Sequence, residues 1–371
     1  MHRRGIVAFL LWLVLGVGVA APLAGAASPP TTEAPPPPIP AAYIVVDVDT
    51  GNIVAQADSR SLHPPASTIK LMTALIAAER LPTTDVVPIS ALAESMPARK
   101  INVKAGQTWT LNDLMHCLLM ISANDAAVAV AERIGGNLDG FTAIAQATAD
   151  RLGLVDKPVF NDPAGLDDQF AHGGGSLISA RDLAIVARAV LARPDLMAII
   201  GKTEYSFNGG DGVSHHFTNH DLFLGMYSGA TGMKTGTTDK AGSTFVGSAT
   251  RNGRTMLTVE FNAPDAYRSA EVLLDQGFAT PVASETKVDA LPAVVKGASV
   301  PTTTAPPVAA GSAAGASTKK SSSLDINSPI VAVAILLAGI VGLVIARRML
   351  IQRHVSQHAA LFDGAAYDDD L

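Results

Sequence analysis

The segment Ser67-Thr68-Ile69-Lys70 places a hydroxyl and an amine three positions apart. Apolar residues recur at helical spacing in the following stretch 71–76, so the segment stands at the predicted start of a helix. Residues i and i+3 share one helical face, which lets the amine of Lys70 reach the hydroxyl of Ser67. Such a lysine can take the proton of a serine only if burial or a nearby cation lowers its pKa far below about 10.4. The pattern also arises by chance and needs support elsewhere in the chain.

A second polar group, Ser122-Ala123-Asn124, follows an apolar run that ends at Ile121 and precedes another predicted helix. A hydroxyl and a carboxamide in this position can relay a proton and hold a substrate amide. The same residue types also cap helices in an ordinary turn. Taken alone, this segment leaves both interpretations open.

A third group, Lys234-Thr235-Gly236-Thr237, begins a predicted strand. A lysine and two hydroxyls at a sheet edge can hold a carboxylate, and Gly236 lets a ligand backbone approach closely. The alternative is a surface strand with a solvated lysine.

The three groups occur in the order S-x-x-K, S-x-N and K-T-G, which is the signature of penicillin-binding proteins and class A β-lactamases. The chain resembles the low-molecular-weight penicillin-binding proteins, the serine D-alanyl-D-alanine carboxypeptidases, over about residues 41–280. Two positions depart from that family's usual pattern: Ala123 replaces a glycine, and Thr237 stands where histidine is frequent, which bears on substrate preference. The stretches that carry the resemblance are PASTIKLMTAL (65–75), ISANDAAVAVAE (121–132), FNDPAGLDD (160–168), SARDLA (179–184) and GMKTGTTDKAGSTFVGSAT (232–250).

The resemblance implies a fold and a mechanism. The fold is α+β and β-lactamase/transpeptidase-like, with an antiparallel sheet, packed helices and a helical subdomain. Ser67 attacks the carbonyl between the two terminal D-alanines of a peptidoglycan stem peptide, Lys70 acts as the base, and Ser122 passes the proton to the leaving amine. No metal and no cofactor are implied.

The resemblance also implies how substrate is held. Asn124 orients the peptide, and the backbone N–H groups of Ser67 and Thr237 form an oxyanion hole. The terminal carboxylate is bound by the third group of the signature, Lys234, Thr235, Gly236 and Thr237. Because β-lactams mimic the D-Ala-D-Ala end, we expect them to inhibit covalently at Ser67.

Several related activities compete with this prediction. A class A β-lactamase has a deacylating glutamate in an E-x-x-L-N segment between the second and third motifs, and residues 161–168 read NDPAGLDD instead. An endopeptidase that cleaves cross-links shares all the catalytic residues, and a transpeptidase belongs to the same fold. A catalytically silent module that binds wall fragments or β-lactams is the alternative from another class.

The elements that must position these groups lie mainly at the two ends of one compact region. A β-branched strand at 43–48, a turn at 49–52 and a return strand from Ile53 open the region. Strands at 243–249 and 255–261 flank Asn252-Gly253, a strong hairpin signal, and a helix at 266–278 closes it. We expect the terminal strands to share one antiparallel sheet.

The section between these strands is predicted to be helical. Thr110 and Ser179 each precede an acidic residue by three positions, a pattern typical of a helix start. Gly135-Gly136 and Pro194 are helix stop signals.

The two ends of the chain predict export and membrane attachment. Arg3 and Arg4 precede an apolar run and an A-x-A cleavage site, which is typical of a signal peptide. The apolar run 330–346 would span about 25 Å as a helix, and the arginines after it favour a cytoplasmic C-terminus. We therefore expect a protein of the bacterial cytoplasmic membrane with its catalytic domain outside the cell. The expected order is a signal peptide (1–26), a Pro-rich lead (27–40), the carboxypeptidase domain (41–285), a Pro/Ala/Ser/Thr tether (286–328), a transmembrane helix (329–351) and a cytoplasmic tail (352–371).

Composition excludes some partners. The net charge is −6, and clustered Lys and Arg are lacking, so nucleic acid is not expected. The one cysteine, Cys117, lies in an apolar run and is predicted to be buried. His215, His216 and His220 are predicted to be solvated residues in a loop, because their surroundings fit no metal-ligand pattern.

Overall fold

The computed structural model describes residues 39–284 and 289–294. The predicted signal peptide, transmembrane helix and cytoplasmic tail lie outside the described residues, as do most of the Pro-rich lead and most of the tether. Within the described ranges, no helix combines the length and the apolar character needed to cross a membrane.

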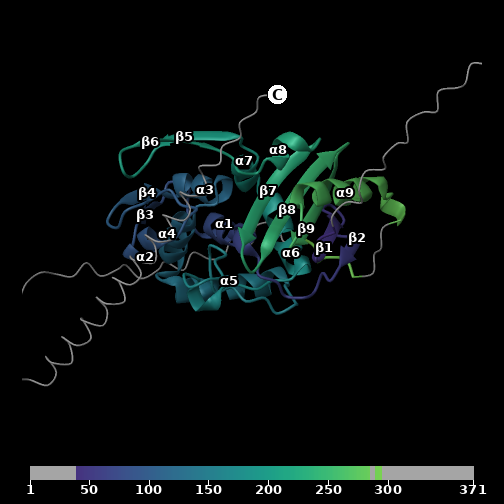
Figure 1. The fold of residues 1–371 in the computed structure, drawn as a ribbon, viewed down its shortest axis with the longest axis horizontal. Helices are drawn as coiled ribbons and strands as arrows, with labels where there is room; N and C mark the ends of the chain where they lie inside the picture. Colours follow the sequence, from purple (N-terminus) through teal and green to yellow (C-terminus); the bar gives the residue numbers. More distant parts are fainter. Residues whose placement is uncertain (1–38, 285–288, 295–371) are drawn as a thin grey trace, which may run out of the picture. The chain divides into compact units, whose positions relative to one another are not determined.

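A five-stranded antiparallel sheet joins the two ends of the described chain, as the sequence predicts (Figure 1). The strand order is β2-β1-β9-β8-β7, so β7, which carries the K-T-G motif, lies at one edge. Neighbouring strands pair antiparallel throughout. The strands are β1 (Ala42–Asp47), β2 (Ile53–Ala57), β7 (Ala230–Thr238), β8 (Gly242–Arg251) and β9 (Arg254–Phe261).

The predicted turns of this sheet are confirmed. Asn252 and Gly253 both have positive φ, 51° and 77°, as a two-residue hairpin turn with a primed geometry requires. Between β1 and β2, the Asp47 carboxylate accepts the backbone N–H groups of Asp49 and Thr50 at 3.1 and 3.0 Å. Local turn chemistry therefore fixes both hairpins.

Helices make up most of the section between the strands. The predicted starts are confirmed, because Thr110 and Ser179 accept the backbone N–H groups of Asp113 and Asp182. Gly136, at φ 76°, ends the helix before it. These helices are α1 (Lys70–Arg80), α2 (Ala91–Ser95), α3 (Leu111–Met120), α4 (Asn124–Gly135), α5 (Leu138–Leu152), α6 (Ala180–Leu191) and α7 (Pro194–Ile200), with a short 3₁₀ turn η2 (His172–Gly174) before α6.

Apolar side chains cover the sheet on both faces. Along β9, Met256 packs with Phe245 and Leu274 on one face, while Leu257 and Val259 belong to the large core on the other. The first face is covered by α9 (Ala266–Ala279) together with α8 (Phe223–Met226), and the second is contacted by α6 (Figure 1). A last 3₁₀ turn, η3 (Val282–Ser284), follows α9.

Two small two-stranded sheets interrupt the section that we expected to be helical. β3 (Val86–Pro88) pairs with β4 (Thr108–Thr110), and β5 (Glu204–Asn208) pairs with β6 (Ser214–Thr218). In β5 and β6, half-buried and exposed residues alternate, so one face of the hairpin packs on the protein.

The predicted loop is wrong for His215 and His216, which lie on β6, although His216 is exposed; His220 is exposed and lies outside the strand, as predicted. The His215 ring stacks on Phe207 at 5.2 Å and lies 5.4 Å from the Trp109 ring. Its Nε2 is 3.1 Å from the Asp211 carboxylate. His215 is thus part of an aromatic cluster and is not a solvated residue.

The folded domain also continues beyond residue 285, where we expected it to end. Leu291 is buried, and its N–H donates to the Gly51 carbonyl at 2.8 Å. Arg188 donates to the Pro292 carbonyl at 2.7 Å. The apolar side chain of Leu291 therefore holds this segment on the domain. Burial of Cys117 is confirmed, and it raises the pKa of the thiol.

Candidate active site

Ser67 lies on a tight turn beside the edge strand. The turn is a short 3₁₀ helix, η1 (Ala66–Ile69), and α1 begins only at Lys70. The Pro65 carbonyl accepts hydroxyls from Thr68 at 2.6 Å and from Thr244 of β8 at 2.9 Å. Ala66 has φ 47°, a conformation that costs a non-glycine residue about 1–3 kcal/mol. The surrounding contacts therefore hold a strained backbone that presents Ser67.

Lys70 is fully buried beneath this turn. Its Nζ lies 2.9 Å from Ser67 Oγ, 2.8 Å from Asn124 Oδ1 and 2.5 Å from the Ala164 carbonyl oxygen. An ammonium group has three N–H donors, so these three oxygens satisfy it completely. A neutral amine has two donors and one lone pair, and of the three partners only Ser67 carries a proton to give. Loss of one proton thus leaves the Lys70 amine ready to accept from Ser67.

The environment of Lys70 favours that neutral form. Burial lowers the pKa of the amine well below its ordinary value, and the positive charge of Lys234 lowers it further. Arg99 acts in the same direction, whereas the carboxylates of Asp162 and Asp125 oppose it. From sequence, a lowered pKa of Lys70 required burial or a nearby cation, and the tertiary structure supplies both.

Ser122 lies between α3 and α4, and Asn124 is the first residue of α4. Ser122 has φ 65°, a second strained non-glycine residue at the cleft. The Asn124 side chain does not cap its helix: Oδ1 accepts from Lys70, and Nδ2 donates to the Pro97 carbonyl at 3.2 Å. The simple capping interpretation of this segment is therefore wrong, since the carboxamide is turned toward the lysine.

The edge strand β7 forms the opposite wall. Gly236 approaches the serine turn so closely that a Cβ would lie 2.8 Å from Ser67 N and 2.5 Å from Thr244 Oγ1. Thr235 and Thr237 flank this glycine, and both line the cleft. Only glycine lets the strand pass this close to Ser67.

Lys234 is buried, so the alternative of a solvated lysine is wrong. Its side chain is 2% exposed, and Nζ donates to the Thr235 carbonyl at 2.8 Å. Burial lowers the pKa of this amine to about 7, with Asp221 raising it and Arg99 lowering it.

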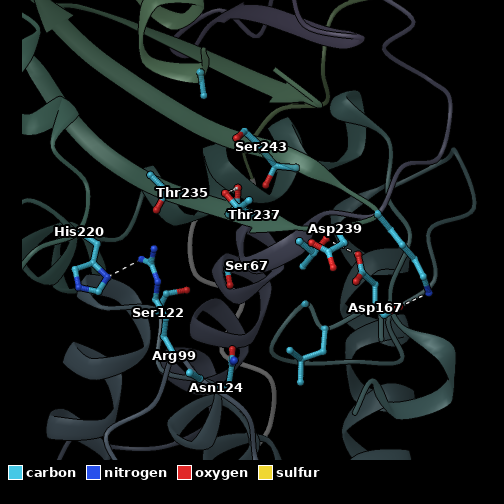
Figure 2. Close-up of a pocket in the computed structure, with 18 of the residues that line it drawn as sticks. Ser67, Arg99, Ser122, Asn124, Asp167, His220, Thr235, Thr237, Asp239 and Ser243 are labelled. Atoms are coloured by element: carbon cyan, nitrogen blue, oxygen red, sulfur yellow. Dashed lines mark hydrogen bonds between the residues drawn. The ribbon is translucent and has the colours of Figure 1, made fainter. Parts of the chain in front are cut away.

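These walls enclose a cleft of about 830 Å³ (Figure 2). Ser67 lies at its centre, with Thr235 and Thr237 of β7 on one side and Ser122 and Asn124 on the other. Lys70 is hydrogen bonded to Ser67, and Lys234 is hydrogen bonded to Thr235. The structure therefore brings together all eight residues singled out from sequence: Ser67, Lys70, Ser122, Asn124, Lys234, Thr235, Gly236 and Thr237.

A loop to which the sequence analysis assigned no role in the site completes it. Asp162 Oδ1 accepts backbone N–H groups from Ala164, Gly165 and Leu166 at 2.7–3.0 Å, and Oδ2 accepts from His172 N at 3.0 Å. This carboxylate thereby fixes the Ala164 carbonyl that accepts from Lys70. The Asn-Asp-Pro-Ala-Gly run carries the signal for such a turn.

Other cleft residues also escaped sequence analysis. The Arg99 guanidinium is hydrogen bonded to His220 Nδ1 at 2.8 Å, and Figure 2 shows the pair beside Ser122 and Thr235. At the other end, Asp167 is hydrogen bonded to Thr238 and to Lys240. The residues of each contact are far apart in sequence, so no local sequence pattern predicts these contacts.

The described residues contain no group of three or more His, Cys, Asp or Glu side chains placed to hold a metal ion. The groups that are present can carry out acyl transfer. A serine hydroxyl faces an amine of lowered pKa, a second hydroxyl lies nearby, and a strand edge offers further polar groups.

The sheet with its flanking helices and the serine–lysine pair in the cleft define a serine acyl-transfer enzyme of the penicillin-binding protein type. Residues 30–265 match the family model described as D-alanyl-D-alanine carboxypeptidase, so the chain belongs to that family. The serine-type carboxypeptidase predicted from sequence is thereby confirmed. The predicted α+β fold with an antiparallel sheet and packed helices is confirmed by the structure.

Known relatives agree with this assignment. The curated D-alanyl-D-alanine carboxypeptidase DacB2 of Mycobacterium tuberculosis is 35% identical over 243 residues, which is 64% of this chain and 81% of that protein. The crystal structure of a D-alanyl-D-alanine carboxypeptidase from the same organism has a TM-score of 0.63 and 33% identity, covering 69% of this chain and 98% of that one.

A more distant structure was solved with an antibiotic bound. Penicillin-binding protein D2 from Listeria monocytogenes, in its ampicillin-bound form, has a TM-score of 0.55 and 27% identity, covering 64% of this chain and 97% of that one. The match extends over only 52–61% of the length of several other curated carboxypeptidases.

Proposed function

We propose that this protein removes the terminal D-alanine from peptidoglycan stem peptides through an acyl-enzyme on Ser67. The observation that carries the proposal is the Lys70 amine, buried 2.9 Å from Ser67 Oγ with two carbonyl oxygens as its other partners. Membership of the carboxypeptidase family supplies the substrate class.

In the acylation step, neutral Lys70 takes the hydroxyl proton as Ser67 Oγ bonds to the carbonyl carbon between the two D-alanines. The backbone N–H groups of Ser67 and Thr237 donate hydrogen bonds to the negative charge that develops on the carbonyl oxygen. In serine enzymes each such donor stabilises the transition state by about 3–4 kcal/mol. The close approach of Gly236 to Ser67 N supports this pairing of turn and strand.

The C–N bond then breaks, and the leaving amine needs a proton. We assign its delivery to Ser122, which lines the cleft in a strained conformation, with Lys70 as the source of the proton. Water later attacks the Ser67 ester, and the shortened peptide leaves. No metal takes part in this scheme.

Substrate binding uses both walls. Asn124 orients the peptide, while Thr235, Gly236 and Thr237 receive the terminal carboxylate, whose charge is balanced by buried Lys234. β-Lactams are expected to acylate Ser67 in the same cleft. The ampicillin-bound relative, which shares the fold, supports this expectation.

We further propose that the domain works on the outer side of a bacterial cytoplasmic membrane. The predicted signal peptide and the apolar run 330–346 support this placement. Fractionation of cells that express the full chain, with a chain ending at residue 328 for comparison, tests it. Recovery of the full chain in the soluble fraction would contradict the proposal.

Replacing the nucleophile tests the chemistry. We expect Ser67→Ala to lower kcat/KM for D-alanine release by at least about 10⁴-fold and to abolish covalent labelling by a fluorescent penicillin. Ser61→Ala is the matched control, because Ser61 is exposed and its hydroxyl donates to Asp58. Equal labelling of Ser67→Ala and the parent protein would rule out this nucleophile.

A further inference from the structure

An aspartate next to the cleft has an unusual environment. Asp221 lies in the turn between β6 and α8 and is 6% exposed. Its Oδ1 accepts the Phe223 N–H at 3.1 Å, whereas Oδ2 is buried and has no hydrogen-bond partner among the described residues. A buried carboxylate oxygen without a donor is costly, so a nearby cation is expected to stabilise it.

The turn that carries Asp221 is firmly held. Asn219 Nδ2 donates to the carbonyls of Ile200 and Lys202, both at 2.9 Å, and Asn219 Oδ1 accepts the Asp221 N–H at 2.9 Å. The His220 N–H donates to the Met120 carbonyl at 2.9 Å. Asp221 is therefore held at this depth by the backbone on either side of it.

Its unpaired oxygen points at the strand that carries Lys234. A Cβ placed on Gly232 would lie 3.7 Å from Asp221 Oδ2. Gly232 and Lys234 are two residues apart on β7 and so share one face, about 7 Å apart along the strand. Because glycine has no side chain there, nothing on Gly232 separates the carboxylate from the stem of Lys234.

The charges complement each other. In the described part of the chain, Lys234 has no ion pair within 4 Å, and its Nζ donates to the Thr235 carbonyl. Burial raises the pKa of Asp221 to about 6 and lowers that of Lys234 to about 7. Each group shifts the other toward its charged form. The other ionisable groups that interact with this cluster are the basic side chains of Arg99, His220 and Lys70 and the phenol of Tyr267.

We propose that Asp221 is a positioning residue that acts through Lys234: its buried carboxylate keeps the Lys234 amine protonated, so that the cleft can bind the carboxylate of the substrate. The proposal rests on the proposed function, since it concerns the charge that receives a peptide C-terminus. Asp221 itself does not touch the substrate.

The test is Asp221→Asn, which keeps Oδ1 as the acceptor for Phe223 and removes the charge. Lys234 must be protonated to act, so kcat/KM falls at high pH as this amine loses its proton. Without Asp221 the amine loses its proton more easily, and we expect this fall to begin about one pH unit lower than in the parent. The measurement is D-alanine release by the full-length protein between pH 5 and 9.

Two comparisons separate this effect from a merely structural one. Asp195→Asn, an exposed aspartate paired with Arg193, is expected to leave the profile unchanged. In a Lys234→Arg background, where residue 234 stays charged, Asp221→Asn is expected to cause no further shift. Asp221→Ser is a second neutral variant, and thermal melting shows which variants are folded.

The outcomes are distinct. An unchanged high-pH limb in a folded neutral variant, or an equal shift in the Lys234→Arg background, overturns the role of Asp221. Failure of the parent protein to release D-alanine instead overturns the proposed function.

Discussion

The cleft has two walls, each with one buried lysine, and the two lysine amines have different hydrogen-bond partners and charged neighbours. Lys70 on the helical wall contacts three oxygens, one of which belongs to a hydroxyl. Lys234 on the strand wall donates to one backbone carbonyl and lies near a carboxylate. Burial lowers the pKa of both amines. The partner decides the rest: a hydroxyl makes Lys70 suited to accept a proton, and a carboxylate makes Lys234 suited to keep one.

Within this comparison, the largest loss of activity is expected from Lys70→Arg. A guanidinium stays protonated throughout the physiological range, so it cannot accept the proton of Ser67. We expect kcat/KM for D-alanine release to fall by about 10³-fold. Lys234→Arg keeps its charge and is expected to retain activity within about tenfold. If Lys70→Arg is the more active of the two, the roles assigned to the lysines are wrong.

A smaller effect is expected from Lys234→Met. Removing a charged partner of the substrate carboxylate costs about 1.5–3 kcal/mol, so KM should rise roughly 10- to 150-fold. Because the charge of Lys234 lowers the pKa of Lys70, its removal raises that pKa. The acid limb of kcat/KM should therefore move to higher pH. Lys104→Met, at an exposed lysine paired with Glu94, is the control. An acid limb that stays in place would show that the two amines do not interact.

The smallest effect is expected at a buried acid, and it concerns stability. Glu260 of β9 is fully buried and hydrogen bonded to Ser269 of α9, and burial raises its pKa from 4.5 to about 8. The folded state keeps a proton that the unfolded chain releases above about pH 4.5. The stability that this proton contributes is complete below that pH and is lost progressively as the pH rises toward 8.

Glu260→Gln removes this pH dependence. Between pH 5 and 9, the Tm of the variant should improve relative to the parent by a few degrees, with activity at pH 7 unchanged. Glu271→Gln serves as the comparison, because Glu271 lies on α9, the helix that carries Ser269. Parallel Tm curves for Glu260→Gln and the parent would mean that Glu260 is ionised in the folded protein.

Local sequence patterns predicted the parts of the fold that local chemistry determines. Asn252-Gly253 set a hairpin because both residues tolerate positive φ, and Thr110 and Ser179 marked helix starts because their hydroxyls accept backbone N–H groups. The β5–β6 hairpin was missed since its strands are short and its histidines look polar. One face of that hairpin carries aromatic rings that pack on one another and on Trp109.

The same division holds in the site. The three motifs identified the eight residues to which a role in catalysis or substrate binding is assigned, because their residue types and order are distinctive. Asp162, Asp221 and the Arg99–His220 pair were not predicted. Each acts through a contact with a residue distant in sequence, and an isolated aspartate or arginine carries no sign of such a contact.

By itself, then, the sequence determined the chemical groups, their order along the chain and the turns and caps that depend on neighbouring residues. The tertiary structure alone decided that both lysines are buried, that Ser67 is held in a strained turn against Gly236, and which carboxylate lies near which amine. The physical reason is that hydrogen-bonding preferences act over a few residues, whereas burial and Coulomb interactions depend on everything that packs around a group.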